Sequence, residues 1–265
     1  MDFIIYEKKD CFASIALNRP KKLNALNDQM LTEVREALLD ADADEQIRVV
    51  ILKGNGRAFS AGFDVSADQT PKVTPADWNG HFSNAWKTFM TIWDMEKPVI
   101  AQVQGHCLGG GFDLTMACDL TIAAENAQFG EPEVLFAGTC MFLLLPWLTT
   151  MKLCKQILLT GEPISAERAL ELGLINQMVP LESLEQAVLN LAKKLARLPL
   201  GTPNQNKRLI NRVYELMNVR EALTLSRDHA VHVLLSKDGE ALEFDRIVEQ
   251  EGLKAALRWR EAKFP

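Results

Sequence analysis

Three consecutive glycines, Gly109-Gly110-Gly111, lie between an apolar segment and a segment of helical character. Glycine has no Cβ, so the backbone can turn sharply there and come close to a ligand. Free N–H groups at the start of a helix point at whatever lies there, and the helix dipole favours negative charge. The run therefore predicts a strand–turn–helix unit that can hold an anion or a developing oxyanion, with Asp113 beside it.

A second glycine turn lies upstream, where the apolar segment Arg48–Lys53 runs into Gly54–Asp64. The triple-glycine turn itself matches neither the dinucleotide-binding nor the P-loop fingerprint. Two such turns could each give one N–H to a single carbonyl oxygen, as acyl-transfer and enolate chemistry need. The pair of turns thus points to carbonyl chemistry rather than to nucleotide binding.

Five segments, in this order along the chain, resemble the enoyl-CoA hydratase/isomerase (crotonase) superfamily: Leu17–Leu26, Arg57–Asp64, Lys97–Asp119, Ala127–Glu133 and Leu159–Ile175. The ending Trp259–Phe264 also fits. The resemblance implies an α/β fold, a crotonase-like spiral of ββα units over residues 1–200. It also implies a C-terminal helical region over residues 201–265 that packs against neighbouring subunits in trimers or dimers of trimers. A monomer whose C-terminal helices fold onto their own core is the alternative.

Local patterns agree with an α/β chain. Phe3–Tyr6 and Phe12–Leu17 have strand character and predict a hairpin, and Asn27 is placed to cap a following helix. Further strands are expected at Val99–Val103, Leu120–Ala124 and Leu174–Val179. These strands alternate with helical stretches, which favours largely parallel strand pairing. Thr70–Gly80 contains two prolines and is interpreted as a loop, with His81 next to it. No strand is expected after residue 201.

The composition of the 265 residues, 48% hydrophobic and 24% charged with a net charge of −6, is that of a globular enzyme. The negative charge disfavours nucleic acid and anionic membranes as partners. No basic-then-apolar leader begins the chain, and the longest apolar run is shorter than the roughly 20 residues needed to cross a bilayer. Five scattered cysteines without a C-x-x-C pair indicate reduced core residues and a cytoplasmic location.

The resemblance assigns the two oxyanion-hole donors to the backbone N–H groups of Phe63 and Gly110. Two donors on a thioester oxygen stabilise the enolate-like state, and loss of one typically costs about 3 kcal/mol. The alternative interpretation is that both glycine turns are only tight corners of the fold.

Two carboxyl groups are the predicted catalytic residues. Asp113 lies where hydratases of this family carry a glutamate that helps to activate water, although an acid in a first helical turn can also be only a favourable partner of the helix dipole. Glu133 matches the second family glutamate, which exchanges a proton with the α-carbon; its apolar neighbours favour a raised pKa. The alternative for Glu133 is a surface loop. Glu131 is expected to lie behind the catalytic acid or at the surface.

The chain departs from the family directly after Glu133. Hydratases continue with a glycine-rich Pro-Gly-Ala-Gly-Gly segment, whereas this chain has Ala137–Leu143 with bulky apolar side chains. Together with the aspartate at position 113, this leaves open a site with one effective acid, which would favour double-bond isomerisation by Glu133 alone. Thr139 and Cys140 could also contact substrate, but a nucleophilic cysteine needs a base and none is identifiable beside Cys140.

The same resemblance assigns a set of residues to coenzyme A binding: Lys21, Lys22, Leu23, Arg57, Ala61, Gly62 and Lys263. Arg260 lies close to Lys263 in the sequence and belongs to the same C-terminal region. For each basic residue, the alternative is a solvated surface charge. The expected acyl pocket is formed by Trp86, Phe89, Met90, Thr139 and Cys140. Trp86, Phe89 and Met90 recur at helical spacing, so core packing is the alternative for them. His81 would lie in the loop that shapes this pocket in the family.

The sequence thus predicts an enoyl-CoA hydratase with Asp113 and Glu133 as its acid/base pair. The alternatives are an enoyl-CoA isomerase, a thioester hydrolase and a binding protein without turnover. No cofactor is expected, because coenzyme A is part of the substrate. No metal is expected either: His229 and His232 are three residues apart but lack a supporting ligand pattern.

Overall fold

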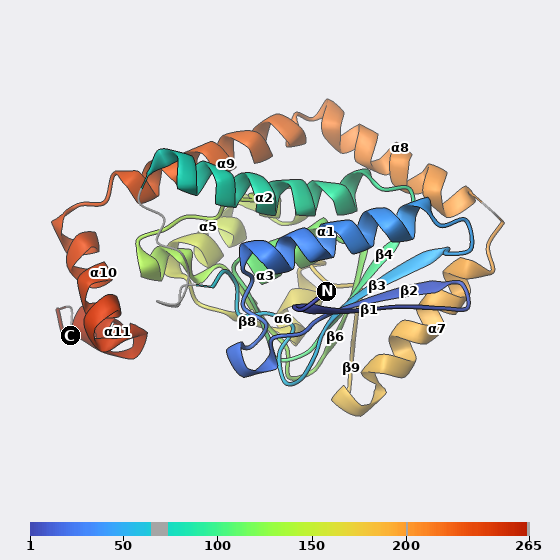
Figure 1. The fold of residues 1–265 in the computed structure, drawn as a ribbon, viewed down its shortest axis with the longest axis horizontal. Coiled ribbons are helices and arrows are strands. Elements are labelled where there is room, and N and C mark those ends of the chain that lie inside the picture. Colours follow the sequence, from blue (N-terminus) through green and yellow to red (C-terminus); the bar gives the residue numbers. More distant parts are fainter. Residues whose placement is uncertain (65–73, 200, 264–265) are drawn as a thin grey trace.

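The computed structural model describes residues 1–64, 74–199 and 201–263 of the chain. Its centre is a six-stranded sheet in the order β1-β2-β3-β4-β6-β9 (Figure 1). In this sheet β1 and β2 pair antiparallel, and the other neighbours pair parallel. The predicted hairpin and the predicted parallel pairing are both confirmed. The strands are β1 (Ile4–Lys9), β2 (Phe12–Leu17), β3 (Val49–Gly54), β4 (Val99–Val103), β6 (Leu120–Ala124) and β9 (Gln177–Val179).

Helices cover both faces of this sheet, so its strands are apolar on both sides. In β3, Val50 and Leu52 face the main core, while Val49 and Ile51 face a second apolar cluster. That second cluster is closed by α7 (Leu184–Ala196), and the main core by α1 (Asp28–Ala43) and α2 (Pro75–Asp94) (Figure 1). As predicted, Asn27 caps α1, its side chain accepting from the Met30 N–H at 2.8 Å.

A smaller sheet of β5 (His106–Leu108), β7 (Gln128–Gly130) and β8 (Ile164–Ser165) positions the site. β5 and β7 pair parallel, with Leu108 opposite Gly130. Because parallel strands end at the same edge of a sheet, α3 (Gly110–Ala117) and the short helix η2 (Pro132–Phe136) begin side by side. A hydrogen bond of 2.8 Å from the Gly109 N–H to the Gly130 carbonyl holds the two turns together.

Between η2 and β9 the chain consists mostly of short helices. The two other 3-10 helices of the described residues, one near the N-terminus and one directly after β9, are also short. Gly161 ends α5 in a left-handed conformation, and Ser165 caps α6. These elements are η1 (Pro20–Lys22), α4 (Leu145–Leu148), α5 (Met151–Thr160), α6 (Ala166–Glu171) and η3 (Leu181–Ser183).

The C-terminal part is helical, and among residues 201–263 there is no strand, as predicted. Here α9 (Val219–Leu235) lies along α2, and α8 (Thr202–Leu216) precedes it (Figure 1). The last pair, α10 (Gly239–Glu251) and α11 (Leu253–Lys263), reaches η2, where the Phe244 and Phe136 rings lie 6.4 Å apart. The predicted division of the chain at residue 200 falls between α7 and α8 and stays a prediction.

Two expectations need correction. The segment Thr70–Gly80, interpreted as a loop, is helical from Pro75 onward. Thr74 and Asp77 form a capping box, and proline is well tolerated in a first helical turn. Residues 70–73 lie outside the described residues. His81 is consequently a buried helix residue, 2.5 Å from the Asp28 carboxylate. The last predicted strand begins only at Gln177.

No helix in the described ranges combines the length and the apolar character needed to span a bilayer.

A buried lysine fastens α8 to the core. Lys207 is 7% exposed and donates to the Ile92 and Lys97 carbonyls and to Asp119, at 2.8, 3.1 and 2.8 Å. We expect Lys207→Met to lower the free energy of unfolding by about 3–5 kcal/mol, because it leaves a partly buried carboxylate unpaired. Urea unfolding measures this, with Lys207→Met/Asp119→Asn as the control that recovers part of the loss. A change below about 0.5 kcal/mol, the range of ordinary surface substitutions, would contradict it.

Candidate active site

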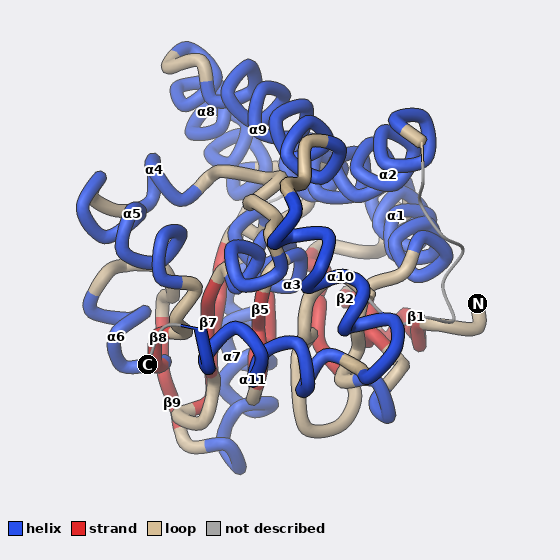
Figure 2. The backbone as a smooth tube through the Cα atoms, turned by 90° about the vertical axis from the view of Figure 1, so that its left-hand side faces the viewer, coloured by secondary structure: helices blue, strands red, loops and turns tan. Residues whose placement is uncertain are grey.

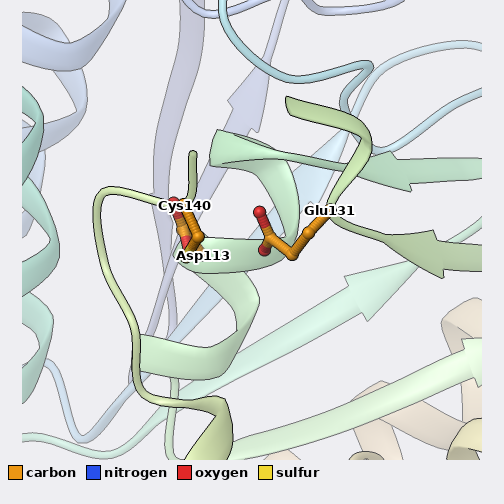
Figure 3. A group of neighbouring side chains, drawn as sticks. All are labelled: Asp113, Glu131 and Cys140. Carbon is orange, nitrogen blue, oxygen red and sulfur yellow. The ribbon is translucent and has the colours of Figure 1, made fainter. Parts of the chain in front are cut away.

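The edge where β5 and β7 end gathers three carboxyl groups. Asp113 lies in the first turn of α3, while Glu131 and Glu133 lie at the entrance to η2. Asp113 and Glu131 are each 1% exposed, and one carboxyl oxygen of Glu133 is fully buried. In Figure 3 the Glu131 carboxyl points from its own strand end toward Asp113 and Cys140. Such a cluster is the kind of site where protons are exchanged with a bound molecule.

Asp113 is hydrogen-bonded to a cysteine in this cluster. Its Oδ1 accepts from the Cys140 thiol, with a sulfur–oxygen distance of 3.5 Å. Among the described residues its Oδ2 is buried without a partner. Burial raises the pKa of Asp113 well above its ordinary value, and the nearby charge of Glu133 raises it further. Asp113 therefore interacts with a second carboxyl group as well as with the helix dipole.

Glu133 is held against the triple-glycine turn. A Cβ on Gly109 would collide with Oε1 of Glu133, and Gly109 has a φ of +50°, which glycine adopts most readily. Oε2 of Glu133 is buried and has no partner in the described part of the chain, and burial raises the pKa of this carboxyl group. A surface-loop position is therefore wrong for the Glu133 carboxyl, although Val134 next to it is exposed.

Glu131 differs from the expectation in part: it does not lie at the surface. Both of its carboxyl oxygens are buried and lack partners among the described residues. No local pattern indicates this burial, since an acid between a glycine and a proline is typical of an exposed turn. The signal that could have revealed it is the pairing of Leu108 with Gly130, which directs the following residue into the cluster.

The turn that contains Gly62 and the triple-glycine turn contact each other beside this cluster. A Cβ on Gly62 would lie 2.9 Å from the Leu108 carbonyl oxygen, and one on Gly110 would lie 2.7 Å from the Phe63 ring. Within the described residues, neither the Phe63 N–H nor the Gly110 N–H donates a hydrogen bond. Two unused donors thus belong to contacting segments, beside the carboxyl group of Glu133. Their role as an oxyanion hole remains a prediction.

Gly109 offers a direct test of this packing. We expect Gly109→Ala to lower kcat/KM by more than about 100-fold, because the new methyl group displaces the Glu133 carboxyl from the turn and small misplacements of catalytic groups carry such costs. Steady-state kinetics measures the effect, with circular dichroism to verify folding. Gly173→Ala is the matched control: Gly173 also has a positive φ, but no atom lies within 4 Å of the position that a Cβ would take there. Equal losses in both variants would contradict this explanation.

The residues assigned to the acyl pocket have different environments. Phe89 is fully buried in the core, with its ring 5.2 Å from that of Phe142, and Met90 is buried as well. Trp86 is half-buried, has Arg227 over its ring at 5.6 Å, and its indole N–H has no partner in the described residues. Thr139 is half-buried, and Cys140 lies in the carboxyl cluster. The pocket itself stays a prediction.

The structure brings part of the predicted coenzyme A site together. The Ala61 N–H donates to the Leu23 carbonyl at 2.9 Å, so the N-terminal motif lies next to the turn that contains Gly62. Lys22 lies 3.9 Å from Asp64, and Lys21 and Arg57 are exposed. Lys263 instead contacts its own helices, pairing with Glu240 at 3.5 Å and lying over the Trp259 ring.

Arg260 has a contact that the sequence did not predict. It donates to the Leu135 carbonyl of η2 and stacks on Phe244, 4.1 Å from the ring centroid. Burial lowers its pKa. The last two helices, shown in front of the smaller sheet in Figure 2, are therefore fixed to the segment that carries Glu133.

Among the described residues, one group of side chains could hold a metal ion. Ligand atoms of Asp113, Glu131 and Cys140 lie within 4.8 Å of one another (Figure 3). Burial raises the pKa of the Cys140 thiol well above its ordinary value, as it does for both carboxyl groups, so these groups favour protons. The His229 and His232 rings on α9 lie 6.4 Å apart. The expectation of no metal remains a prediction.

The fold and the cluster define a class: an α/β protein in which buried carboxyl groups with raised pKa values lie beside two contacting glycine turns. Residues 7–251 match the family model described as enoyl-CoA hydratase/isomerase. The chain belongs to the enoyl-CoA hydratase/isomerase family.

Relatives match from about four fifths of the chain to all of it. A crotonyl-CoA hydratase of Syntrophomonas wolfei is 35% identical over 98% of this chain and 97% of its own length. A short-chain-enoyl-CoA hydratase of Clostridium acetobutylicum is 36% identical over 79% of this chain and 81% of its own. The crystal structure of an enoyl-CoA hydratase/isomerase from Xanthobacter autotrophicus Py2 has a TM-score of 0.95 and 36% identity, covering 100% of this chain and 99% of that one. This similarity confirms the predicted fold class.

Proposed function

We propose that this protein is an enoyl-CoA hydratase that adds water to an α,β-unsaturated acyl-CoA thioester. The observation that carries the proposal is the placement of Glu133 against Gly109, directly beside the unused N–H of Gly110, with Asp113 in the same cluster. The names of the two relatives given above support the same reaction and favour short acyl chains as first substrates.

The chemistry follows from these positions. The thioester oxygen accepts from the N–H groups of Phe63 and Gly110, which stabilises the enolate-like state. Asp113 in its ionised form takes a proton from water as the water oxygen bonds to the β-carbon. The electron pair of the double bond moves toward the α-carbon, which receives a proton from Glu133. Return of the proton from Asp113 to Glu133 restores the enzyme, so atoms and charge balance.

Isomerisation is the second candidate, and one observation favours it. The raised pKa of Asp113 lowers the share of its ionised form at neutral pH, which would leave Glu133 to remove and return a proton alone. Thioester hydrolysis through Cys140 lacks such support: the structure does place a carboxyl group, Asp113, beside the thiol, but burial and the neighbouring acids raise the pKa of that thiol well above its ordinary value and so disfavour the nucleophilic thiolate.

A three-way assay tests the proposal. Purified protein is given a short 2-enoyl-CoA, the matching 3-enoyl-CoA and a thiol-reactive dye in separate reactions. Hydration predicts loss of the conjugated thioester absorbance from the 2-enoyl substrate with no free thiol. A gain of that absorbance from the 3-enoyl substrate as the faster reaction would establish isomerisation instead, and released thiol would establish hydrolysis. Tight acyl-CoA binding without turnover would leave the binding-only alternative.

The assembly and location remain proposals as well. We propose a homo-oligomer, supported by the apolar side chains that α8 exposes, among them Leu209, Val213 and Leu216. A cytoplasmic, reducing compartment is supported by five free cysteines. An acyl-CoA thioester is the proposed small-molecule partner, and the net charge of −6 gives no support for nucleic acid.

A further inference from the structure

Cys140 contacts one of the proposed catalytic acids, although the reaction above does not use it. Its thiol sulfur lies 3.5 Å from Oδ1 of Asp113 (Figure 3), and the two residues are 5% and 1% exposed. Among the described residues no other hydrogen bond reaches the Asp113 carboxyl group, since its Oδ2 is buried without a partner. The contact therefore engages one oxygen of Asp113 and not the other.

The chemistry of the two groups sets the direction of this bond. An ionised carboxylate only accepts hydrogen bonds, so the shared hydrogen must belong to the sulfur. The surroundings keep it there, because Cys140 is buried and faces Asp113, Glu131 and Glu133, which raises the pKa of the thiol well above its ordinary value. Cys140 is thus a neutral donor whenever Asp113 is ionised.

The segment that carries Cys140 is fixed to the core directly after it. The side chains of Met141 and Phe142 are buried in the main core. The Ser226 hydroxyl of α9 lies 3.0 Å from the Met141 carbonyl oxygen and accepts from the Leu143 N–H at 3.2 Å. A thiol on a segment anchored in this way can hold its partner in one orientation.

The same contact joins the two departures of this chain from the family pattern. Those departures are the shorter acid at position 113 and the segment Ala137–Leu143, which stands where hydratases have a glycine-rich segment. Glu131 completes the cluster, with ligand atoms within 4.8 Å, yet neither of its carboxyl oxygens has a hydrogen-bond partner among the described residues. The geometry therefore assigns the thiol to the aspartate.

We propose that Cys140 is a positioning residue for hydration: its thiol hydrogen holds Oδ1 of Asp113, so that Oδ2 is the oxygen that takes the proton from water. This deepens the proposed function and rests on it. The S–H bond stays intact throughout the reaction. The thiol fixes the plane of the carboxyl group and stabilises its ionised form, because hydrogen bonds to charged acceptors are the stronger ones.

Two variants of nearly equal size test the donor role. Cys140→Ala and Cys140→Ser both remove the bulk of the sulfur, and only serine keeps a hydrogen to donate. We expect Cys140→Ala to lower kcat for hydration by about 10-fold with little change in KM, which is the lower end of the range for a lost hydrogen bond to a charged group. We expect Cys140→Ser to stay within about 3-fold of the natural kcat, since a donor remains.

The matched control is Cys154→Ser on α5, which removes a sulfur of similar burial, 6% exposed, outside the acid cluster. It should keep the natural kcat. If Cys140→Ala also keeps the natural kcat, the thiol does not position Asp113. If Cys140→Ser is slowed as much as Cys140→Ala, the sulfur only fills space. Either result overturns the proposal.

A second readout needs no turnover. Donation of its hydrogen weakens the S–H bond of a thiol, so the infrared S–H stretch moves to lower frequency. Subtracting the spectrum of the matching Cys140→Ser protein isolates the Cys140 band in each background. We expect this band to move to higher frequency in Asp113→Leu, which has no acceptor. Asp113→Asn keeps a weaker acceptor and should move the band in the same direction by a smaller amount, which preserves the test if Asp113→Leu does not fold.

The outcomes of this measurement separate the inference from the proposed function. A Cys140 band that stays in place in the Asp113 variants overturns the inference even if hydration is established. A band that moves in Glu131→Leu instead also overturns it, because the thiol would then serve Glu131. The expected shift in a protein that does not hydrate enoyl-CoA would overturn the proposed function and leave the contact itself established.

Discussion

Glu133→Gln is expected to lower kcat for hydration by about 10²–10⁴-fold, the usual contribution of a positioned general acid or base. The amide has the same shape and still fits against Gly109, but it cannot supply a proton to the α-carbon. The dissociation constant for a saturated acyl-CoA should stay within a few-fold, because the substitution leaves the proposed oxyanion donors and the proposed coenzyme A contacts untouched. Steady-state kinetics and calorimetric titration measure the two quantities.

The control for this variant is Glu125→Gln, which changes an exposed acid between β6 and β7. It should keep the activity of the natural protein. Turnover by Glu133→Gln at the natural rate would remove Glu133 from the mechanism, and with it the proton transfer proposed for this site.

We expect Asp113→Asn to lower kcat for hydration by about 10²–10⁴-fold as well. We also expect this variant to be more stable than the natural protein at neutral pH. Activity falls because an amide cannot take a proton from water. Stability rises because Asp113 is buried with a raised pKa, so its ionisation opposes folding as pH rises above about 4, the unfolded value. Kinetics and urea unfolding at pH 5 and pH 8, both chosen above that value, test the two halves of this prediction together.

The same variant separates hydration from isomerisation. If Glu133 works alone, Asp113→Asn keeps its activity on a 3-enoyl-CoA while showing none on a 2-enoyl-CoA. A variant that is less stable at pH 8 than the natural protein would contradict the electrostatic account of Asp113, whatever its activity.

Much of the fold could be predicted because its signals are local. The strand Val99–Val103 and the helix cap at Asn27 depend on apolar pattern and on one side-chain hydrogen bond. The start of α2 was mistaken because prolines normally interrupt structure, whereas Pro75 follows a capping residue and takes a position that needs no N–H bond.

The site was only half predictable, for a physical reason. Asp113 and Glu133 could be assigned through the residues around them and a family resemblance. The burial of Glu131 depends on the register of β5 against β7, two short strands separated by α3 and β6. The attachment of Arg260 to Leu135 joins residues 125 positions apart. Contacts of that separation leave no local pattern, so only the folded arrangement reveals them.

The central claim is that Asp113 directs water to the β-carbon while Glu133 supplies the α-proton. Its most direct test is turnover of a short 2-enoyl-CoA in heavy-oxygen water, with mass spectrometry of the product. The account predicts a 3-hydroxyacyl-CoA that carries the label at the hydroxyl group, and no labelled product with Asp113→Asn. An isobaric product with a moved double bond, or labelled product at the natural rate from Asp113→Asn, would contradict it.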